Sequence, residues 1–269
     1  MNATPTPEYV VARSVLLDAL AALGVHRDAV VLVGAQAVYL HTGDADLAVA
    51  PTTTDADLAL APALLPDAPL LGDVMRSAGF KPGADPGTWT GRFGVAIDLL
   101  VPEALSGRGG RRGARLPAHG NDVARRALGL EAAVVANAPH EVGALATGDS
   151  RRFTIRVAQP AALLVAKVIK IEERRATPGR LRPKDGLDVL RLLQTSATDH
   201  LAADLDRLVA DDLAGPVTRM AMDALREHGS DPDGPVTTLA VTAAGVLANP
   251  DTIRASVPAL VADLLAAVR

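Results

Sequence analysis

Residues 52–60, with the sequence TTTDADLAL, decide how the rest of the chain is interpreted. The alternation over Asp57–Ala61 predicts a β-strand, and in Asp-x-Asp on a strand the two side chains point to the same face. Asp55 and Asp57 so placed repel each other unless a cation lies between them, and carboxylate oxygens are ligands that Mg²⁺ prefers. Because an Asp-Ala-Asp in an Asp-rich chain also suits a solvated turn, the interpretation depends on the neighbouring residues.

Three neighbouring features favour a functional site. Upstream, the buried-strand pattern of Ala29–Val33 runs straight into Gly34 and a short predicted helix, whose free backbone N–H groups can hold phosphate. Immediately before the acids, Thr53 and its neighbours provide hydroxyl groups. Downstream, Asp98 lies inside the apolar run VAIDLLV, where a lone buried charge is costly without a cation or a partner.

A second acidic pair leaves a choice of site. Asp44–Pro51 has the sequence DADLAVAP and Asp55–Pro62 has DADLALAP, a repeat too short to be architectural. The first pair, Asp44 and Asp46, is therefore the alternative metal pair. We favour the second pair because the threonines precede it and because the residues that follow it have better strand character.

The composition describes a chain of 269 residues that can bury a sizeable core, with 49% hydrophobic and 22% charged residues. The net charge of −4 creates no global basic field toward nucleic acid or anionic lipid. The absence of cysteine excludes disulfides, thiolate metal sites and cysteine nucleophiles. The first residues lack the pattern of a secretory signal, and the longest apolar run, Ala29–Leu40, is too short to span a membrane. We therefore expect a cytoplasmic protein without a membrane partner.

The chain is predicted to divide near residue 157. Before that point helical and strand patterns alternate, which favours an α/β unit over a bundle. Helices are expected over residues 8–24, 35–41 and 65–80, a hairpin-like pair of strands over 89–101, and further strands near 130–136 and 153–157. After Gln159-Pro160 nearly every segment has helical periodicity. The prediction is an α/β domain over residues 1–157 and an α-helical domain over 158–269, with the active site between them.

These motifs together resemble a known fold family. Val33-Gly34-Ala35, then Thr53-x-Asp55-x-Asp57, then Asp98 in a strand resemble the signature of the polymerase-beta-like nucleotidyltransferase fold. The runs GAQAVYLHTG, TTDADL, IDLLVP, PAALLVAK and RPKD-x-x-D are more particularly similar to the minimal nucleotidyltransferases of AbiEii/MenT type. Those proteins are toxins of bacterial toxin–antitoxin and phage-abortive systems. The resemblance covers roughly residues 28–195 and implies an α/β (α+β) nucleotidyltransferase domain with a small mixed sheet, followed by an α-helical domain.

The resemblance implies roles for the residues of the first half. Gly34 and the following amide, that of Ala35, would hold the triphosphate of the nucleotide. Asp55 and Asp57 would bind Mg²⁺, and Asp98 would be either a third metal ligand or the base for the attacking hydroxyl. The distance from Gly34 to Asp55 is longer than in most members, which would place Asp44 and Asp46 in an insertion.

It also implies roles for residues of the second half. Lys167 would contact the nucleotide phosphates, and Asp185, together with Asp188, would orient that lysine or the incoming base. Thr53 matches a hydroxyl position next to the acids. Lys170 follows Lys167 by three positions and so lies on the same helix face. Without the resemblance, Lys167 suits the edge of a helix and the two aspartates suit a first turn stabilised by the helix dipole.

The function implied by the resemblance is an Mg²⁺-dependent transfer of NMP from an NTP to an acceptor hydroxyl. Three carboxylates holding two Mg²⁺ ions would clamp the α-phosphate for in-line attack. The acceptor would be a tRNA 3′ end, and the protein would be a toxin neutralised by an antitoxin. Arginines near a Pro-Gly turn, at positions 174, 175, 180 and 182, are usually solvated surface but could contact RNA phosphate. Two alternatives remain: nucleotidylation of a small molecule such as an aminoglycoside, and a catalytically silent nucleotide-binding scaffold.

Overall fold

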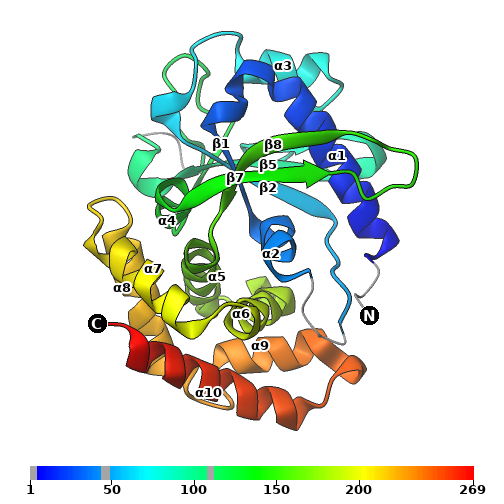
Figure 1. The fold of residues 1–269 in the computed structure, drawn as a ribbon. Helices are drawn as coiled ribbons and strands as arrows, with labels where there is room; N and C mark the ends of the chain where they lie inside the picture. The colour runs from blue at the N-terminus through cyan, green and yellow to red at the C-terminus, as the bar shows by residue number, and fades with distance from the viewer. Residues whose placement is uncertain (1–4, 44–48, 108–111) are drawn as a thin grey trace.

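A mixed β-sheet forms the first part of the protein in this computed structural model, which describes residues 5–43, 49–107 and 112–269 (Figure 1). The strand order is β3-β4-β5-β2-β1-β8-β7, and β6 also pairs with β5. Strand β2 is antiparallel to β1 and parallel to β5, while β1 is parallel to β8. The strands are β1 (Val30–Val33), β2 (Asp55–Leu60), β3 (Lys81–Pro82), β4 (Thr88–Thr90), β5 (Ala96–Pro102), β6 (Arg125–Ala127), β7 (Asn137–Gly143) and β8 (Arg152–Ala158). This mixed sheet with its helices confirms the predicted fold class.

Helix α1 (Pro7–Leu23) is a core helix of the sheet-bearing part. The Thr6 hydroxyl accepts a hydrogen bond from the Tyr9 amide at its start, and nine of its side chains are buried. Among the described residues, the segment Pro7–Ala29 is long and apolar enough to cross a membrane by length and composition alone. The buried core helix of a folded domain passes the same test, and 56% of the apolar window is buried inside this fold.

The centre of the sheet carries the predicted strand–helix junction. All four residues of β1 are buried. A strand that is covered on both sides carries apolar side chains on both faces, as β1 does. Helix α2 (Gly34–Thr42) begins directly after β1, without an intervening loop. The hairpin predicted within residues 89–101 corresponds to β4 and β5, which pair antiparallel.

Two predicted elements differ from the structure. The segment 130–136, predicted as a strand, contains helix α4 (Glu131–Val135), and the strand β7 begins only at Asn137. The buried carboxylate of Glu131 accepts the amide protons of Gly129 and Ala104, which ties the start of this helix to two loops.

The helix predicted over residues 65–80 is also shorter than expected. Helix α3 covers only Leu71–Ser77. Pro66 and Pro69 precede it, and proline removes an amide donor and disfavours helical backbone in the residue before it.

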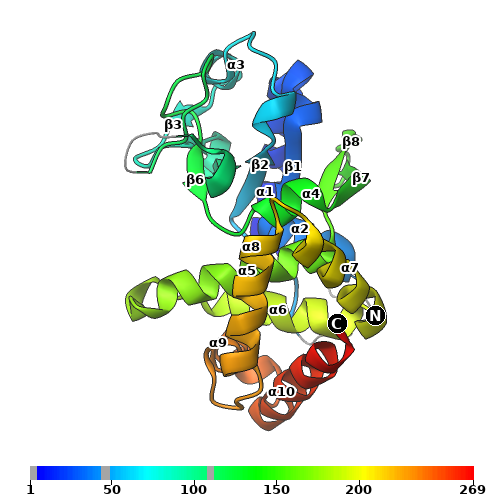
Figure 2. The same ribbon diagram turned by 90° about the vertical axis from the view of Figure 1, so that its left-hand side faces the viewer.

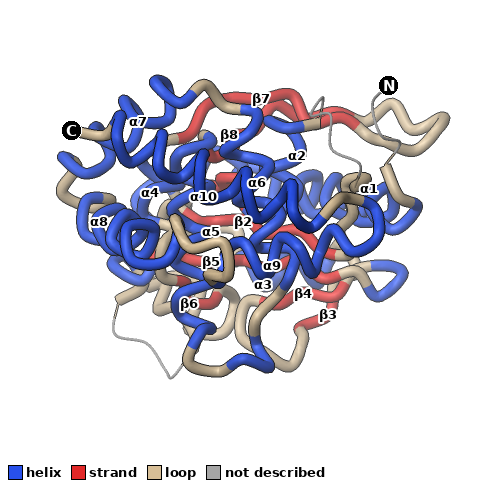
Figure 3. The backbone as a smooth tube through the Cα atoms, turned by 90° about the horizontal axis from the view of Figure 1, so that it is seen from below, coloured by secondary structure: helices blue, strands red, loops and turns tan. Residues whose placement is uncertain are grey.

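The residues after β8 are helical, as predicted. The helices are α5 (Pro160–Arg175), α6 (Pro183–Thr195), α7 (Thr198–Ala210), α8 (Gly215–Ala224), α9 (Pro235–Ala244) and α10 (Pro250–Ala267). Helices α5 and α6 contact α2, whereas α10 lies far from the sheet (Figures 1 and 2). Seen from below, α6, α9 and α10 lie in front of the strands (Figure 3). Because the buried apolar side chains form one continuous cluster from α1 to α10, the division into two domains near residue 157 stays a prediction.

Candidate active site

Gly34 brings the start of α2 against the acidic strand. Its φ of 68° lies in the left-handed region that favours glycine. A β-carbon at this position would lie 2.1 Å from Oδ2 of Asp57, so any side chain here would force the Asp57 carboxylate to move. The backbone at the N-terminus of α2 therefore lies directly beside one of the predicted metal ligands.

The three predicted carboxylates lie on one face of adjacent strands. Asp57 pairs in register with Val33 of β1 on one side and with Asp98 of β5 on the other. Asp55 is two positions before Asp57 on the same strand and so shares its face. All three aspartates are partly exposed to solvent. The structure thus brings together the three acids that the sequence singled out.

The pKa of Asp57 is raised above its ordinary value. Burial is the largest cause, and the neighbouring carboxylates of Asp55 and Asp98 raise the pKa further. Lys170 and, more weakly, Lys167 offset part of this effect. No described residue donates a hydrogen bond to the Asp57 carboxylate, so the site has an excess of negative charge that a cation would relieve.

Thr53 links Asp55 to the helical part of the chain. The buried Thr53 hydroxyl donates to Oδ1 of Asp55 over 2.6 Å. The ammonium of Lys184, in the first turn of α6, donates to the same hydroxyl over 2.9 Å. A hydroxyl has one proton and two lone pairs, so these two bonds fix its orientation: the Thr53 proton points toward Asp55, and a lone pair points toward Lys184. Thr53 therefore contacts the acid through its side chain, as the sequence position suggested.

Asp98 is held by two residues that the sequence did not point to. Its Oδ1 accepts a hydrogen bond from the Thr88 hydroxyl over 2.6 Å, and its Oδ2 forms an ion pair with Arg125, also at 2.6 Å. Thr88 belongs to β4 and Arg125 to β6, and strand pairing brings both to β5. No local spacing could have revealed them, because Arg125 is 27 positions away from Asp98.

The donor set fits a hard divalent cation. Three carboxylates on one face, one of them with a raised pKa, are the oxygen ligands that Mg²⁺ takes, usually with waters completing its shell. Within residues 5–43, 49–107 and 112–269, no three His, Asp or Glu side chains already converge as a complete metal cluster. Asp55, Asp57 and Asp98 are the residues that would hold such a cation.

Lys167 lies in a buried ion-pair cluster rather than beside the acids. Its ammonium is 2.9 Å from Oδ1 of Asp185 and 2.6 Å from Oδ2 of Asp188, and all three side chains are almost fully buried. Burial lowers the pKa of Lys167, but the two carboxylates outweigh it, so its pKa lies above the ordinary value. For Asp185 burial raises the pKa, while Lys167, Lys170 and Arg174 lower it, and the net shift is downward. Both aspartates thus form ion pairs with this lysine, and its predicted contact with nucleotide phosphates stays a prediction.

Lys170 is the lysine with the largest electrostatic effect on Asp57. It is half-buried on the same face of α5 as Lys167, and among the charges around Asp57 its effect on the pKa is the largest. It makes no hydrogen bond or ion pair with any residue that the structure describes. Lys170 is therefore better placed than Lys167 to meet a phosphate next to the acids.

The remaining predicted residues are easily placed. The Ala35 side chain is buried in the first turn of α2, where only its backbone amide could reach a phosphate. The alternative acidic pair, Asp44 and Asp46, lies outside the described residues.

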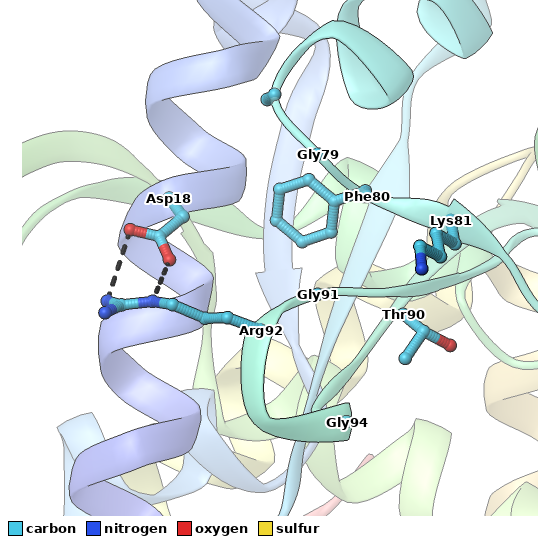
Figure 4. A pocket seen from close by; sticks show the side chains of 9 residues that line it. Asp18, Gly79, Phe80, Lys81, Thr90, Gly91, Arg92 and Gly94 are labelled. Atoms are coloured by element: carbon cyan, nitrogen blue, oxygen red, sulfur yellow. Dashed lines mark hydrogen bonds and ion pairs between the residues drawn. The ribbon is translucent and has the colours of Figure 1, made fainter.

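A separate cavity of about 430 Å³ lies away from these acids. It is formed between α1, the start of β3 and the loop after β4, and the ion pair of Arg92 with Asp18 crosses its edge (Figure 4). None of the predicted site residues lines this cavity.

A glycine-initiated helix beside three carboxylates on neighbouring strands is an arrangement suited to phosphate chemistry with a divalent metal. The model of a nucleotidyltransferase family matches residues 12–212, so the chain belongs to this family and is a nucleotidyltransferase. Enzymes of this family generally use divalent metal ions and NTP substrates.

Other comparisons add little. Among solved structures, an antigenic nucleotidyltransferase-like protein from Paracoccidioides brasiliensis is similar, with 15% sequence identity and a TM-score of 0.35. The match covers 83% of this chain and 95% of that one. No curated protein matches this chain. The narrower AbiEii/MenT type therefore stays a prediction.

Proposed function

We propose that this nucleotidyltransferase uses Mg²⁺ to transfer NMP from an NTP to an acceptor hydroxyl. The observation that carries the proposal is the register of β2 with β5, which aligns Asp57 with Asp98 beside Gly34. The bond that forms joins the acceptor oxygen to the α-phosphorus, and the bond that breaks releases pyrophosphate. The N-terminal amides of α2 would hold the triphosphate.

Asp55, Asp57 and Asp98 would hold the metal. When bound, Mg²⁺ would neutralise charge on the α-phosphate and lower the pKa of the acceptor hydroxyl. The hydroxyl proton would go to a carboxylate, for which Asp98 is the candidate because it lies at the edge of the acidic face next to Thr88. Lys170 would stabilise the negative charge that develops on the phosphates.

The proposed acceptor is the 3′ end of a tRNA. Basic side chains gather where α5 ends: Arg180 and Arg182 act electrostatically on Arg174, and Lys170 and Arg180 act on Glu173. Such a group of basic side chains suits an acceptor with phosphates on both sides of the reacting nucleotide. The resemblance to the AbiEii/MenT type further supports a toxin role with a cognate antitoxin, and NTP and tRNA as substrates support a cytoplasmic location.

A labelling experiment tests the proposal. The purified protein is incubated with Mg²⁺ and each α-³²P-labelled NTP in turn, with total tRNA, an aminoglycoside panel or no acceptor. We expect label on tRNA. Label on an aminoglycoside would instead assign a small-molecule acceptor, and nucleotide binding without transfer to any acceptor would contradict the proposed reaction.

Paired variants decide which acids act. Asp55→Asn/Asp57→Asn should lose at least about a hundredfold in rate, the magnitude typical of removing transition-state electrostatics. Asp44→Asn/Asp46→Asn is the matched control, since it removes the same charge from the repeated sequence. Activity lost in the control and kept in the first variant would assign the metal to the upstream pair.

A further inference from the structure

Strand pairing surrounds Asp98 with three different partners. On one side Asp57 lies opposite it on β2, and on the other side Thr88 lies opposite it on β4. Beyond the end of β4, strand β6 takes over the same edge of β5 and places Arg125 opposite Leu100. Leu100 is two positions after Asp98, so Arg125 and Asp98 are diagonal neighbours on one face.

Both carboxylate oxygens of Asp98 are engaged on the side away from Asp57. Oδ1 accepts the Thr88 hydroxyl proton, and Oδ2 contacts the Arg125 guanidinium, each over 2.6 Å. The Arg125 and Asp98 side chains are 30% and 18% exposed, so water screens this ion pair only in part. A short, charge-assisted bond of this kind fixes the orientation of a carboxylate.

The ion pair between Arg125 and Asp98 reduces the repulsion between carboxylates in the metal-free site. Asp57 and Asp98 lie opposite each other on paired strands, where like charges destabilise the sheet. Arg125 provides the positive charge that Asp98 lacks when no cation is bound, whereas Asp57 receives no hydrogen bond from the described residues. The two carboxylates therefore differ: one is free to meet a cation, and the other already has one.

We propose that Arg125 is a latch that occupies the third carboxylate in the metal-free protein and competes with the divalent cation for it. Because the guanidinium draws on the negative charge of Oδ2, a metal bound by this carboxylate would have to weaken the ion pair between Arg125 and Asp98. This inference rests on the proposed function, because the cation is the one that Asp55, Asp57 and Asp98 would share. Arg125 thereby sets the metal affinity of the resting enzyme.

Mn²⁺ binding to the nucleotide-free, full-length protein tests the latch. Free Mn²⁺ is measured by electron paramagnetic resonance for the wild type, Arg125→Gln, Asp98→Asn and the double variant. Arg125→Gln should lower the Mn²⁺ dissociation constant at least about fivefold, the lower end of typical coupling between two sites. In the Asp98→Asn background the same substitution should change the affinity far less, because the carboxylate for which Arg125 and the metal compete is absent.

Arg112→Gln is the matched charge control. Arg112 forms an exposed ion pair with Asp85, and its carbonyl accepts the Arg126 amide, so it lies near β6 without contacting Asp98. If Arg112→Gln, or Arg125→Gln in the Asp98→Asn background, tightens Mn²⁺ binding as much as Arg125→Gln alone, the effect is long-range charge and the latch is wrong. Unchanged or weaker binding in Arg125→Gln also overturns it. Should this variant fail to fold, Arg125→Lys keeps the positive charge but binds the Asp98 carboxylate less firmly. It should lower the Mn²⁺ dissociation constant by a smaller factor.

The outcomes separate this inference from the proposed function. Mn²⁺ binding that follows the latch pattern in a protein that transfers no nucleotide would leave the latch standing and contradict the proposed reaction. Mn²⁺ bound by Arg125→Gln but not by the wild type would support a particularly strong latch. Binding by neither protein would overturn both the latch and the metal site.

Discussion

Gly34 shows how closely backbone and chemistry are joined at a single residue. The left-handed φ and the 2.1 Å approach to Asp57 are two independent reasons for glycine at this position. The first reason, the left-handed backbone conformation, applies equally to other glycines of the chain with positive φ. The second is specific to Gly34, because the space that a methyl group would need is occupied by the Asp57 carboxylate.

Gly34→Ala should therefore abolish transfer. The left-handed backbone costs about 1–2 kcal/mol of stability, and displacement of Asp57 should lower the rate at least about a hundredfold. Urea unfolding and the labelling assay measure the two effects. Gly94→Ala is the control, because Gly94 has a φ of 73° but nothing within 4 Å of its β-carbon position. It should lose similar stability and keep its activity; equal activity losses in both variants would mean that strain alone is responsible.

His26 is a second residue whose surroundings set its behaviour. The ring is fully buried, with Nε2 2.8 Å from the Pro69 carbonyl and Nδ1 without a hydrogen-bond partner among the described residues. Burial lowers the pKa of His26, the Pro69 carbonyl raises it slightly, and the neighbouring ring of His119 lowers it. The neutral form is thus the one that the fold accommodates.

The free energy of unfolding should consequently fall on mild acidification. The unfolded state binds the proton more readily, so the stability contribution of His26 is present above its ordinary pKa of about 6.5 and is lost as the pH falls toward the lowered folded value. His26→Gln should give a shallower decline between about pH 7.5 and 5.5. Urea titrations across this range measure the slope. An unchanged slope would show that His41, whose pKa burial also lowers, carries the effect instead.

At the scale of elements, the Lys167 cluster joins α5 to α6. One ammonium compensates two carboxylates that are nearly inaccessible to water, and Arg174 adds a second cation on Asp185 at 2.9 Å. Removing one member of such a buried group leaves charge without compensation, which costs far more than the intact group contributes.

Lys167→Met should therefore destabilise the protein by about 3–5 kcal/mol. Adding Asp188→Asn should restore part of this loss, because Asp188 loses its ion-pair partner in this variant whereas Asp185 keeps Arg174. Chemical denaturation measures both. A stable but inactive Lys167→Met variant would contradict the structural role and favour direct contact with nucleotide phosphate.

The sequence predicted elements best where the signal was local. The junction at Gly34 and the strand with Asp55 and Asp57 follow from apolar runs and alternation. In the segment 131–135 the local pattern does not distinguish a helix from a strand. The buried Glu131 carboxylate accepts the amide protons of Gly129, two positions away, and of Ala104, 27 positions away, and only the folded chain brings Ala104 to this point. Pro66 and Pro69 did give a local signal against a long helix over residues 65–80.

The site was predictable to the extent that its residues lie in motifs. The three acids were singled out because each lies in a distinctive pattern, whereas Asp185 and Asp188 were singled out only through the family resemblance. Thr88 and Arg125 reach Asp98 only through the pairing of β4 and β6 with β5, which no pattern in one sequence specifies. The same reason explains why Lys170 was noted only for its helical spacing.

At the scale of the whole molecule, a net-negative protein has to attract a polyanion for the proposed reaction. Its surface charges are not distributed evenly, since Arg174, Arg180 and Arg182 lie close enough together to influence one another. Local charge of this kind guides an acceptor more than the net charge of −4 does.

Arg180→Ala/Arg182→Ala should weaken tRNA binding and make it less dependent on salt. For every phosphate that the variant no longer neutralises, the slope of log K against log salt should fall by about 0.7–0.9. Fluorescence anisotropy with labelled tRNA at several salt concentrations measures the slope. Arg76→Ala/Arg226→Ala removes the same charge from exposed helix pairs elsewhere and should leave it unchanged. Equal slopes for all three proteins would exclude these arginines from the acceptor path.

The bond from Lys184 to Thr53 has a consequence for how such enzymes can be recombined. It crosses from the first turn of α6 to the residue that orients Asp55, so the helices do more than offer a surface for the acceptor. A chimaera that joined this sheet to helices without a lysine at this point would lose the bond that holds the Thr53 hydroxyl, so Lys184 would have to be transplanted together with Thr53 and Asp55.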